Sequence, residues 1–372
     1  MEDSIFAIAL STVSSPVIHG VWDRVSCLGP AEIYRLLDSS GSRPETQDYL
    51  REKYPSDPLA AAELILKTAR ELNVRTIHYW QADYPRMLAE TARPPLALYA
   101  LGDFRFADSV AVVGSRRADP RSRLIARRIC GRLAAEGYAV VSGMAMGIDR
   151  ESHEAALDSS GSTVGVLANG IDITYPLSNR DLYRRILSTP GSGLVSEYPP
   201  GTFTRKWTFV RRNRIISGLC LGTVVVKAGS RSGALITAGY ALEQNRELFA
   251  CTGYSLDPDY EGCIRLIQKG AYAVATADDI VSELRAPSFR RATGAFGSGS
   301  RRVLRPESSP CLPFENDDPA AMKILSLLKQ GQRDVDDLAR MSGFPVNIVN
   351  EALIVLELSG KIVKNGSTVA AV

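Results

Sequence analysis

Three consecutive segments decide the fold class: SVAVVGS (109–115), RSRLIARRICGRLAAEG (121–137) and YAVVSG (138–143). The first and third are short runs rich in valine, which is typical of strands buried on both faces of a sheet. The segment between them has apolar residues at helical spacing. Because a helical crossover joins neighbouring parallel strands, the three segments predict a β–α–β unit.

Four more segments of the strand type follow along the chain: STVGVLANG (162–170), GLVSEY (193–198), GTVVVKAG (222–229) and ELFACTG (247–253). Helical runs lie between them, including SGALITAGYALEQNR (232–246). Strands that alternate with amphipathic helices form a parallel sheet that helices cover on both faces. We therefore predict an α/β fold over 76–285, with an extended, Rossmann-like, doubly wound parallel sheet.

Residues 1–75 are predicted to form a small all-α domain. Apolar residues recur at helical spacing in IFAIALSTV (5–13), around HGVWDRVSCL (19–28) and in AEIYRLLDSS (31–40). Gly29 and Pro30 separate the last two segments, and proline is favoured at the start of a helix. The module resembles a sterile-alpha-motif or helix-hairpin-helix domain, and its expected role is packing or interaction.

The rest of the chain predicts a linker and a winged-helix-like domain. Residues 286–318 are rich in Gly, Ser and Pro without a hydrophobic period, which indicates a flexible linker. Residues 319–372 predict helices over 319–330, 335–343 and 347–360, and then a hairpin with Asn365-Gly366 as its turn. The third helix has Glu351 and Glu357 but no Lys or Arg, so we expect the domain not to read DNA bases.

Composition indicates a cytoplasmic protein with reduced thiols. The six cysteines form no CxxC pair, the N-terminus lacks the basic start of a signal peptide, and no apolar run is long enough to span a membrane. The net charge is only +3, yet 35 of the 44 basic residues are arginine, which suits bidentate phosphate contacts. A genome rich in G and C would raise the arginine content as well.

The stretch FTRKWTFVRRNRIISGL (203–219) interleaves cations with aromatic rings and has no acidic residue. Its cations are Arg205, Lys206, Arg211, Arg212 and Arg214, and Trp207 and Phe209 lie among them. Single-stranded nucleic acid is bound by this combination, because cations hold phosphates and rings stack on unpaired bases. The alternative is a solvated cationic surface, which would leave the exposed rings without a purpose.

Three glycine-rich loops follow predicted strands, at the edge where parallel sheets bind ligands. In VVGSRRADPRSR (112–123), Gly114, Ser115, Arg116 and Arg117 predict an anion site, against the alternative of a plain turn with solvated arginines. In VSGMAMGIDRESHEAAL (141–157), Gly143 and Gly147 permit close backbone approach, while Asp149 is expected to cap a helix and His153 to be structural. In KAGSRSGALITAGYALEQ (227–244), Gly229 and Gly233 flank Arg231.

The sequence patterns of common catalytic sites are absent. There is no GxxxxGK[ST] motif, no GxGxxG after the first strand, no GxSxG motif and no second histidine at metalloprotease spacing from His153. We therefore predict a binding protein rather than an enzyme, with no cofactor and no metal.

Five long motifs in order carry a resemblance to a known family: VAVVGSRR (110–117), VSGMAMGIDRESHEAAL (141–157), ANGIDITYPLSNRDLY (168–183), SEYPPGTFTRKWTFVRRNRIISGL (196–219) and SGALITAGYALEQNRE (232–247). Together they resemble the DNA-processing protein A (DprA/Smf) family over about 110–285. The resemblance implies an extended Rossmann core, often with a small helical N-terminal domain and a C-terminal winged helix. It also implies single-stranded DNA binding, protection of incoming DNA, loading of the RecA recombinase in natural transformation and recombination, homodimerisation through the core and no required cofactor.

The resemblance assigns phosphate and base contacts to Arg116, Lys206 and Phe209, and matches the family's glycine-rich loop to 142–149. The residues expected to bind single-stranded DNA, from the motifs and the resemblance together, are Gly114, Ser115, Arg116, Arg117, Ser142, Gly143, Met144, Ala145, Gly147, Lys206, Phe209, Arg211, Arg212 and Arg214. The chain departs from the family at Met146, where many members have arginine, and at 251–253, where Cys-Thr-Gly replaces Val-Pro-Gly. The first change is expected to weaken one phosphate contact, and the second to affect packing only.

Two rival functions stay open. The fold also resembles phosphoribohydrolases that cleave nucleoside monophosphates, and Glu243 occupies a place comparable to their helical glutamate. Their PGGxGTxxE motif is absent from this sequence. The other rival is a transcriptional regulator that acts through the winged helix.

Overall fold

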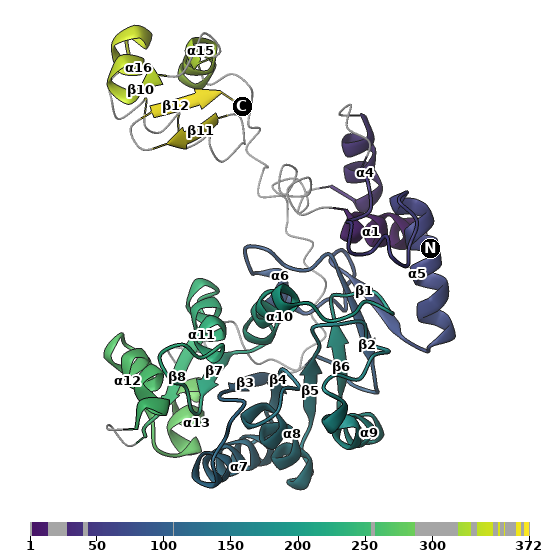
Figure 1. The fold of residues 1–372 in the computed structure, drawn as a ribbon, viewed down its shortest axis with the longest axis vertical. Coiled ribbons are helices and arrows are strands. Elements are labelled where there is room, and N and C mark those ends of the chain that lie inside the picture. Colours follow the sequence, from purple (N-terminus) through teal and green to yellow (C-terminus); the bar gives the residue numbers. More distant parts are fainter. Residues whose placement is uncertain are drawn as a thin grey trace. The chain divides into compact units, whose positions relative to one another are not determined.

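A computed structural model describes residues 2–13, 28–39, 44–106, 108–253, 257–286, 319–328, 333–344, 349, 353, 362–365 and 368–371. These residues fall into two compact units, of which the first holds the large sheet and the second holds the C-terminal hairpin (Figure 1). Each unit has an apolar core of its own.

The large sheet contains, among the described residues, nine strands in the order β1-β2-β6-β5-β4-β3-β7-β8-β9. Their bounds are β1 Arg75–His78, β2 Ala97–Leu101, β3 Ser109–Val113, β4 Ala139–Ser142, β5 Thr163–Val166, β6 Gly193–Ser196, β7 Gly222–Val225, β8 Glu247–Cys251 and β9 Tyr272–Val274. The strands from β6 through to β9 pair in parallel. Only the β1–β2 and β2–β6 pairs of this sheet are antiparallel. The predicted fold class is confirmed.

All six predicted strands are present as β3 to β8, and three further strands were not predicted from the sequence. Strand β1, with the sequence RTIH, has two β-branched residues between a charged residue and a histidine, and β2, with the sequence ALYAL, contains none. Strand β9 has three residues, of which two are exposed. Short strands without β-branched runs give no periodic signal.

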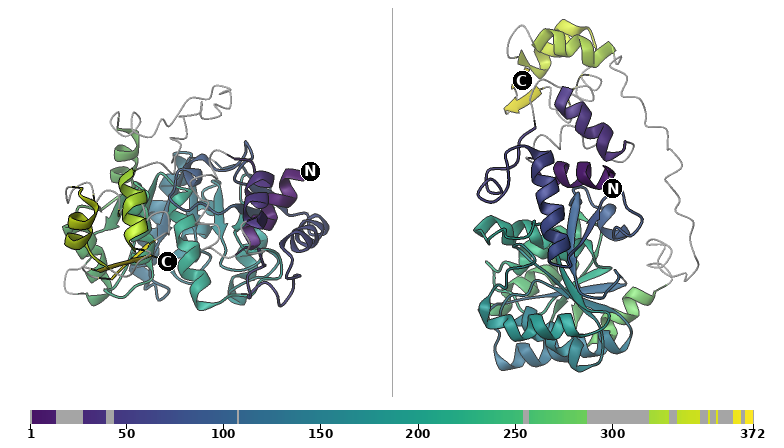
Figure 2. Two further views of the ribbon diagram at one scale, coloured as in Figure 1. Left: turned by 90° about the horizontal axis from the view of Figure 1, so that it is seen from above. Right: turned by 90° about the vertical axis from the view of Figure 1, so that its right-hand side faces the viewer.

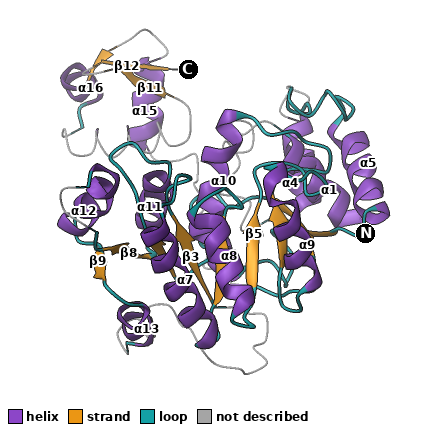
Figure 3. Cartoon of the chain, turned by 60° about the horizontal axis from the view of Figure 1, so that its bottom comes forward, coloured by secondary structure: helices purple, strands orange, loops and turns teal. Residues whose placement is uncertain are grey.

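Helices cover both faces of the sheet, as Figures 2 and 3 show. Their bounds are α6 Arg86–Ala89, α7 Pro120–Ala135, α8 Ile148–Asp158, α9 Arg180–Ser188, α10 Lys206–Gly218, α11 Ala234–Glu243, α12 Glu261–Gln268 and α13 Ala277–Arg285, with 3-10 turns η1 Leu177–Asn179 and η2 Pro258–Tyr260. Successive side chains of β3 point to opposite faces of the sheet. Ala111 and Val113 pack in the cluster under α10 and α11, whereas Val110 and Val112 pack in the cluster under α7, α8 and α13.

Strand β3 lies between β4 and β7, which is where the chain changes its direction of travel across the sheet. From β3 the chain builds one half of the sheet out to β6, and then returns to the other side of β3 to form β7. The loops after β3 and β7 therefore lie side by side, and Ser115 N donates to Lys227 O over 2.8 Å. Ligands of doubly wound sheets bind at this kind of position.

The N-terminal helices are α1 Glu2–Thr12, α4 Pro30–Ser39 and α5 Pro58–Glu71. Helix α4 begins at Pro30, as predicted, and Asp57 caps α5 by accepting from Leu59 N. Helices α1 and α5 contact each other and strand β1. The helix predicted around 19–28 lies outside the described residues except at Leu28, and the boundary at residue 75 stays a prediction.

The C-terminal elements are α15 Pro319–Leu328, β10 Arg333–Asp334, α16 Val335–Ser342, β11 Ile362–Asn365 and β12 Thr368–Ala371. The predicted hairpin is confirmed, but the predicted turn at Asn365-Gly366 is wrong, because Asn365 pairs with Thr368 as the last residue of β11. Strand β10 pairs with β12 and was not predicted. Of the third predicted helix, 347–360, only Val349 and Leu353 lie within the described residues. The predicted linker lies outside them after residue 286.

Candidate functional site

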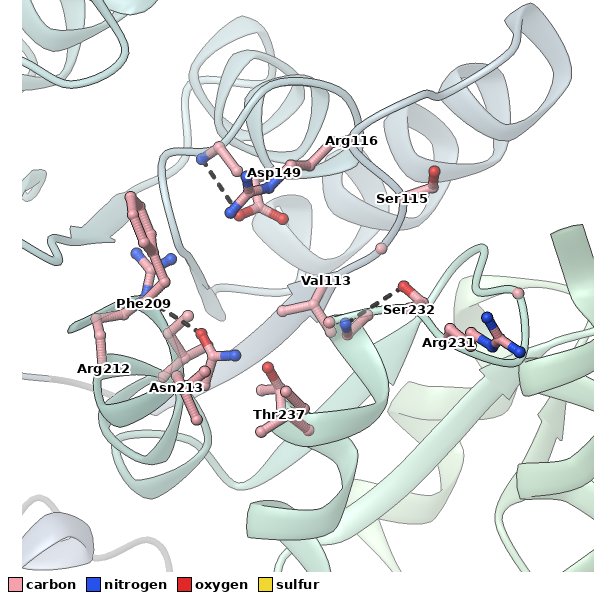
Figure 4. Close-up of a pocket in the computed structure, with 18 of the residues that line it drawn as sticks. Val113, Ser115, Arg116, Asp149, Phe209, Arg212, Asn213, Arg231, Ser232 and Thr237 are labelled. Carbon is pink, nitrogen blue, oxygen red and sulfur yellow. Dashed lines mark hydrogen bonds between the residues drawn. The ribbon is translucent and has the colours of Figure 1, made fainter. Parts of the chain in front are cut away.

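A cleft of about 840 Å³ opens at the carboxyl ends of the parallel strands, where the loops after β3 and β7 meet helix α10 (Figure 4). Seven of the predicted site residues line it: Gly114, Ser115, Arg116, Ala145, Lys206, Phe209 and Arg212. They come from three segments that are far apart in the sequence. The cleft is therefore lined both by the loop that carries Arg116 and by the cation–aromatic stretch 203–219.

Arg116 and Phe209 form the most distinctive pair in the cleft. The Arg116 guanidinium carbon lies 5.3 Å from the centroid of the Phe209 ring, at cation–π distance. The Tyr175 ring lies 5.6 Å from the Phe209 ring at a tilt of 50°. Arg116 and Lys206 are exposed, and neither forms an ion pair with another described residue. Their charges are therefore available to an anionic ligand beside an aromatic face.

Close backbone contacts hold the Arg116 loop in place. Ile148 N, in the first turn of α8, donates to Ser115 O over 3.1 Å. Gly147 has a φ of +79°, and a Cβ there would lie 2.3 Å from Ser115 O. Gly114 would place a Cβ 2.7 Å from Ile148 Cγ1. The two glycines thus position the loop, and side chains at these places would displace it.

Lys227 and Asp119 connect the same two loops electrostatically. Lys227 is 3% exposed, and its Nζ lies 2.5 Å from Asp119 Oδ2 and 3.0 Å from Asp259 Oδ2. The hydrogen bond from Lys227, with one from Ser122 N, lowers the pKa of Asp119 to about 2. Burial by itself would lower the pKa of Lys227, but the two carboxylates outweigh it and raise that pKa. Asp119 also caps α7 by accepting from Arg121 N and Ser122 N.

Arg212 reaches the cleft wall, but its guanidinium is used inside the fold. The residue is 4% exposed, and its Nη1 donates to Gly143 O over 2.5 Å and to Val166 O. A Cβ on Gly143 would lie 2.6 Å from Arg212 Nη2, so glycine is needed there for the guanidinium to fit. The neighbouring Asp149 has a raised pKa because burial outweighs the opposing influence of Arg212 and of the Ala145 N–H. The predicted phosphate contact of Arg212 would compete with these carbonyl bonds.

Arg211 and Arg214 do not line the cleft. Arg211 Nε lies 3.4 Å from Glu197 Oε1, and Arg214 pairs with the other oxygen of the same carboxylate. The Glu197 side chain is only 5% exposed. Arg214 Nη1 also donates to Arg93 O over 2.8 Å. These two arginines are therefore held by a buried acid from the end of β6.

Four other predicted residues lie beside the cleft rather than along its lining. Ser142 is fully buried and donates to Val112 O over 2.6 Å. Met144 is 1% exposed, and its carbonyl accepts from Asn179 Nδ2 over 2.9 Å. Arg117 is exposed and unpaired among the described residues, and Gly147 supports the Arg116 loop. The side chains of Ser142 and Met144 point into the protein, so only their backbone could meet a ligand.

His153 has the structural role that was predicted, but the prediction that Asp149 caps a helix is wrong, because Gly147 is the N-cap of α8 and no side chain caps it. Asp149 lies in the first turn of α8 and accepts from Ala145 N over 3.3 Å. His153 is fully buried, with Nδ1 2.6 Å from Thr163 Oγ1. Burial lowers the pKa of His153 to about 3, so the ring is neutral at physiological pH.

Several residues of the cleft are missing from the predicted site: Tyr175, Asn213, Arg231, Ser232 and Thr237. For Arg231 a signal existed, since it lies between two glycines in a loop that follows a strand. Asn213 stands between arginines, and Thr237 lies on a helix with ordinary apolar spacing, so neither stands out in the sequence.

Within the described part of the chain, no group of three or more His, Cys, Asp or Glu side chains is arranged to hold a metal ion. A search of the same residues for a helix of the length and apolarity that a membrane span requires finds none.

Comparison with known proteins identifies close relatives. The family model for DNA recombination-mediator protein A matches residues 75–285, and the model for the DprA winged helix domain matches residues 309–365. The putative DNA processing protein DprA of Mycobacterium tuberculosis is 42% identical over 365 residues, covering 94% of this chain and 90% of that protein.

Two solved structures agree with these matches. The structure of DNA processing protein A from Streptococcus pneumoniae superposes with a TM-score of 0.60 at 30% identity, covering 76% of this chain and 98% of that one. A structure that addresses the single-stranded DNA binding mode of DNA processing protein A from Helicobacter pylori has a TM-score of 0.51 at 26% identity. It covers 57% of this chain and 95% of that one.

Proposed function

Because the chain belongs to the DNA recombination-mediator protein A family, we propose that it binds single-stranded DNA in the cleft and acts in DNA processing. The observation that carries the proposal is the exposed Arg116 guanidinium beside the Phe209 ring, with Lys206 on the same wall. A cation next to an exposed aromatic face binds phosphate and an unstacked base together. Duplex DNA presents no free base to the ring, so we expect weaker duplex binding.

A binding titration with a labelled oligo-dT strand and its duplex form tests this function. Arg116→Ala and Lys206→Ala should weaken binding to all sequences alike, since they remove phosphate contacts. Phe209→Ala should remove about 1–3 kcal/mol of stacking. Phe209→Leu keeps an apolar contact to Tyr175 but offers no flat face, so it should resemble Phe209→Ala.

A matched control is Arg128→Ala on α7, because Arg128 is exposed, forms no ion pair with a described residue and does not line the cleft. It should bind as the wild type does. Equal affinity of the wild type, Arg116→Ala and Phe209→Leu for oligo-dT, with all variants folded, would contradict the site.

The wider role that we propose is protection of incoming single strands and delivery of the RecA recombinase to them during natural transformation and recombination. Homodimerisation through the core and a cytoplasmic location belong to the same proposal. Family membership supports these points. An order-of-addition strand-exchange assay would test delivery, and sedimentation analysis would test the dimer.

We further propose that the protein does not catalyse a reaction, and the position of Glu243 supports this over a phosphoribohydrolase function. Glu243 is the last residue of α11, is exposed and does not line the cleft. A carboxylate at that place cannot assist bond cleavage in a ligand bound among Arg116, Phe209 and Thr237. Release of base from AMP that is lost in Glu243→Gln would overturn this proposal.

The C-terminal domain is proposed to serve partner binding or self-association rather than base reading. Its basis is the pair of acidic residues and the absence of Lys and Arg in the sequence 347–359. The domain divisions at 1–75, 76–285, 286–318 and 319–372 stay predictions. Deletion of 319–372 should leave affinity for single strands within tenfold, or about 1.4 kcal/mol, and a larger loss with an intact core would contradict the proposal.

A further inference from the structure

Two residues of the cation–aromatic stretch, Arg205 and Trp207, do not line the cleft. They stand on either side of Lys206, which does line it. Arg205 is the N-cap of helix α10, Lys206 is its first residue and Trp207 is its second. The contacts of Arg205 and Trp207 therefore help to fix where the Lys206 backbone lies.

Both residues contact residues 44–57, the segment that precedes helix α5. Arg205 Nη2 lies 2.6 Å from Glu52 Oε1. The centroids of the Trp207 and Tyr49 rings lie 5.1 Å apart at an interplanar angle of 73°, which is the edge-to-face geometry that aromatic pairs prefer. A segment from the N-terminal part of the chain thus holds the start of α10 at two points.

The same segment is attached to the loop that leads from β6 to α10. The ring of Tyr198 in that loop lies 6.4 Å from the Tyr49 ring and 6.1 Å from the Trp207 ring, so the three rings form one cluster. Tyr198 is only 1% exposed. The Tyr54 hydroxyl donates to Pro200 O over 2.5 Å. Residues 44–57 therefore hold both the first turn of α10 and the loop before it.

The later part of α10 is held by other contacts. Arg212 donates to two buried carbonyls, and Arg214 pairs with Glu197. The first turn of a helix is less constrained than its interior, because its N–H groups have no partner within the helix. The part of α10 that carries Lys206 is therefore the part that gains most from an anchor outside the helix.

We propose that Tyr49 is a positioning residue for DNA binding, which holds Lys206 at the wall of the cleft by packing against Trp207. This inference rests on the proposed binding of single-stranded DNA. Tyr49 does not line the cleft, so its substitution affects affinity only by moving the start of α10. Without the Tyr49 ring the first turn loses its anchor, and Lys206 loses its contact with phosphate.

The test is a salt titration of oligo-dT binding by the full chain. Tyr49→Leu keeps an apolar side chain but removes the ring, and it should weaken binding about three- to tenfold, or about 0.7–1.4 kcal/mol. It should also make the slope of log affinity against log salt shallower by up to about 0.7, the contribution of one phosphate contact. The substitution removes no charge, so a purely structural role would leave the slope unchanged. Tyr49→Phe keeps the ring and should bind as the wild type does.

Further variants separate positioning from direct contact. Trp207→Leu should weaken binding at least as much as Tyr49→Leu does. In a chain that already carries Lys206→Ala, Tyr49→Leu should cause no further loss, because the effects of coupled residues do not add. Arg51→Ala is the matched control, because Arg51 lies in the same segment but pairs with Glu45 inside it. This control should bind as the wild type does.

A folded Tyr49→Leu with the affinity and slope of the wild type would overturn the proposal. A loss in Trp207→Leu alone would also overturn it, since Trp207 would then contact the DNA itself. An equal loss from Tyr49→Leu with and without Lys206→Ala would contradict it as well. If Tyr49→Leu does not fold, Trp207→Leu with and without Lys206→Ala provides the same test.

These outcomes are distinct from failure of the proposed function. Weaker binding by Lys206→Ala would leave that function standing even if Tyr49→Leu bound oligo-dT normally. Failure of the wild type to bind oligo-dT would instead overturn the function itself.

Discussion

Helix α10 carries two sets of cations that differ in what surrounds them. Lys206, at its start, is exposed and unpaired among the described residues, and it lines the same cleft as Arg116. Arg212 and Arg214, further along the helix, are held by buried carbonyls and by Glu197. Both sets belong to one basic run in the sequence. The difference teaches that acceptors from distant segments decide which cations remain available to a ligand.

Substitution of the buried arginines should lower the stability of the fold more than substitution of the exposed cations does. When a buried guanidinium is removed, its buried partners cannot reach water instead. The Glu197 side chain is 5% exposed and forms ion pairs with both Arg211 and Arg214. Removing one member of a buried charge network leaves the others uncompensated. The exposed set has water as its alternative partner, so its loss should affect ligand binding and leave stability unchanged.

The largest effect is expected for Arg212→Met. The substitution leaves the carbonyls of Gly143 and Val166 without a donor, and should lower the free energy of unfolding by about 3 kcal/mol. Chemical denaturation measures it, with Arg128→Met as the exposed control. If Arg212→Met has normal stability and fails to bind DNA, Arg212 contacts the ligand and does not stabilise the fold.

A somewhat smaller effect is expected for Gly147→Ala, which tests the support of the Arg116 loop. The positive φ and the approach of a Cβ to Ser115 O at 2.3 Å should lower the free energy of unfolding by about 2 kcal/mol. DNA affinity should fall too, because the loop must move. Gly233→Ala is the control. Gly233 lines the same cleft and has no positive φ, and a Cβ added there would meet no atom within 4 Å. Thermal unfolding should therefore give a lower melting temperature for Gly147→Ala than for Gly233→Ala. Equal melting temperatures would contradict the proposed support of the Arg116 loop by Gly147.

The contact between Lys227 and Asp119 should make stability depend on acid pH. The pKa of Asp119 is lowered from 3.8 to about 2, so its charge contributes stability that is present above pH 3.8 and is lost as the pH falls through 2. Asp119 is 38% exposed, and after allowance for screening we expect Asp119→Asn to lose about 1 kcal/mol at neutral pH. Asparagine remains a good helix cap, so the variant isolates the charge. Unfolding measured against pH should show the difference between the two proteins vanish below pH 2.

The sequence predicts the sheet well because its central strands are short, β-branched and buried on both faces. It cannot predict β2 or β9, since ALYAL has no β-branched residue and YAV has only one, and both owe their conformation to pairing with neighbours. Tertiary context overrides propensity in such segments.

The candidate site is predicted less completely, because residues from distant segments decide which of its side chains are available to a ligand. The motifs identify Arg116, Lys206 and Phe209, which line the cleft together. They cannot show that Arg211 and Arg214 pair with Glu197, because Glu197 follows strand β6 and only the fold brings it next to helix α10. Nor can they show that Thr237 lines the cleft, since this follows from the packing of α10 against α11.

The salt dependence of oligo-dT binding tests most directly the claim that the exposed cations bind the DNA backbone. Each phosphate contact to a single strand contributes about 0.7 to the slope of log affinity against log salt. The account predicts a shallower slope for Arg116→Ala by about that amount and an unchanged slope for Arg128→Ala. Identical slopes for the wild type and Arg116→Ala, with both proteins folded, would contradict it.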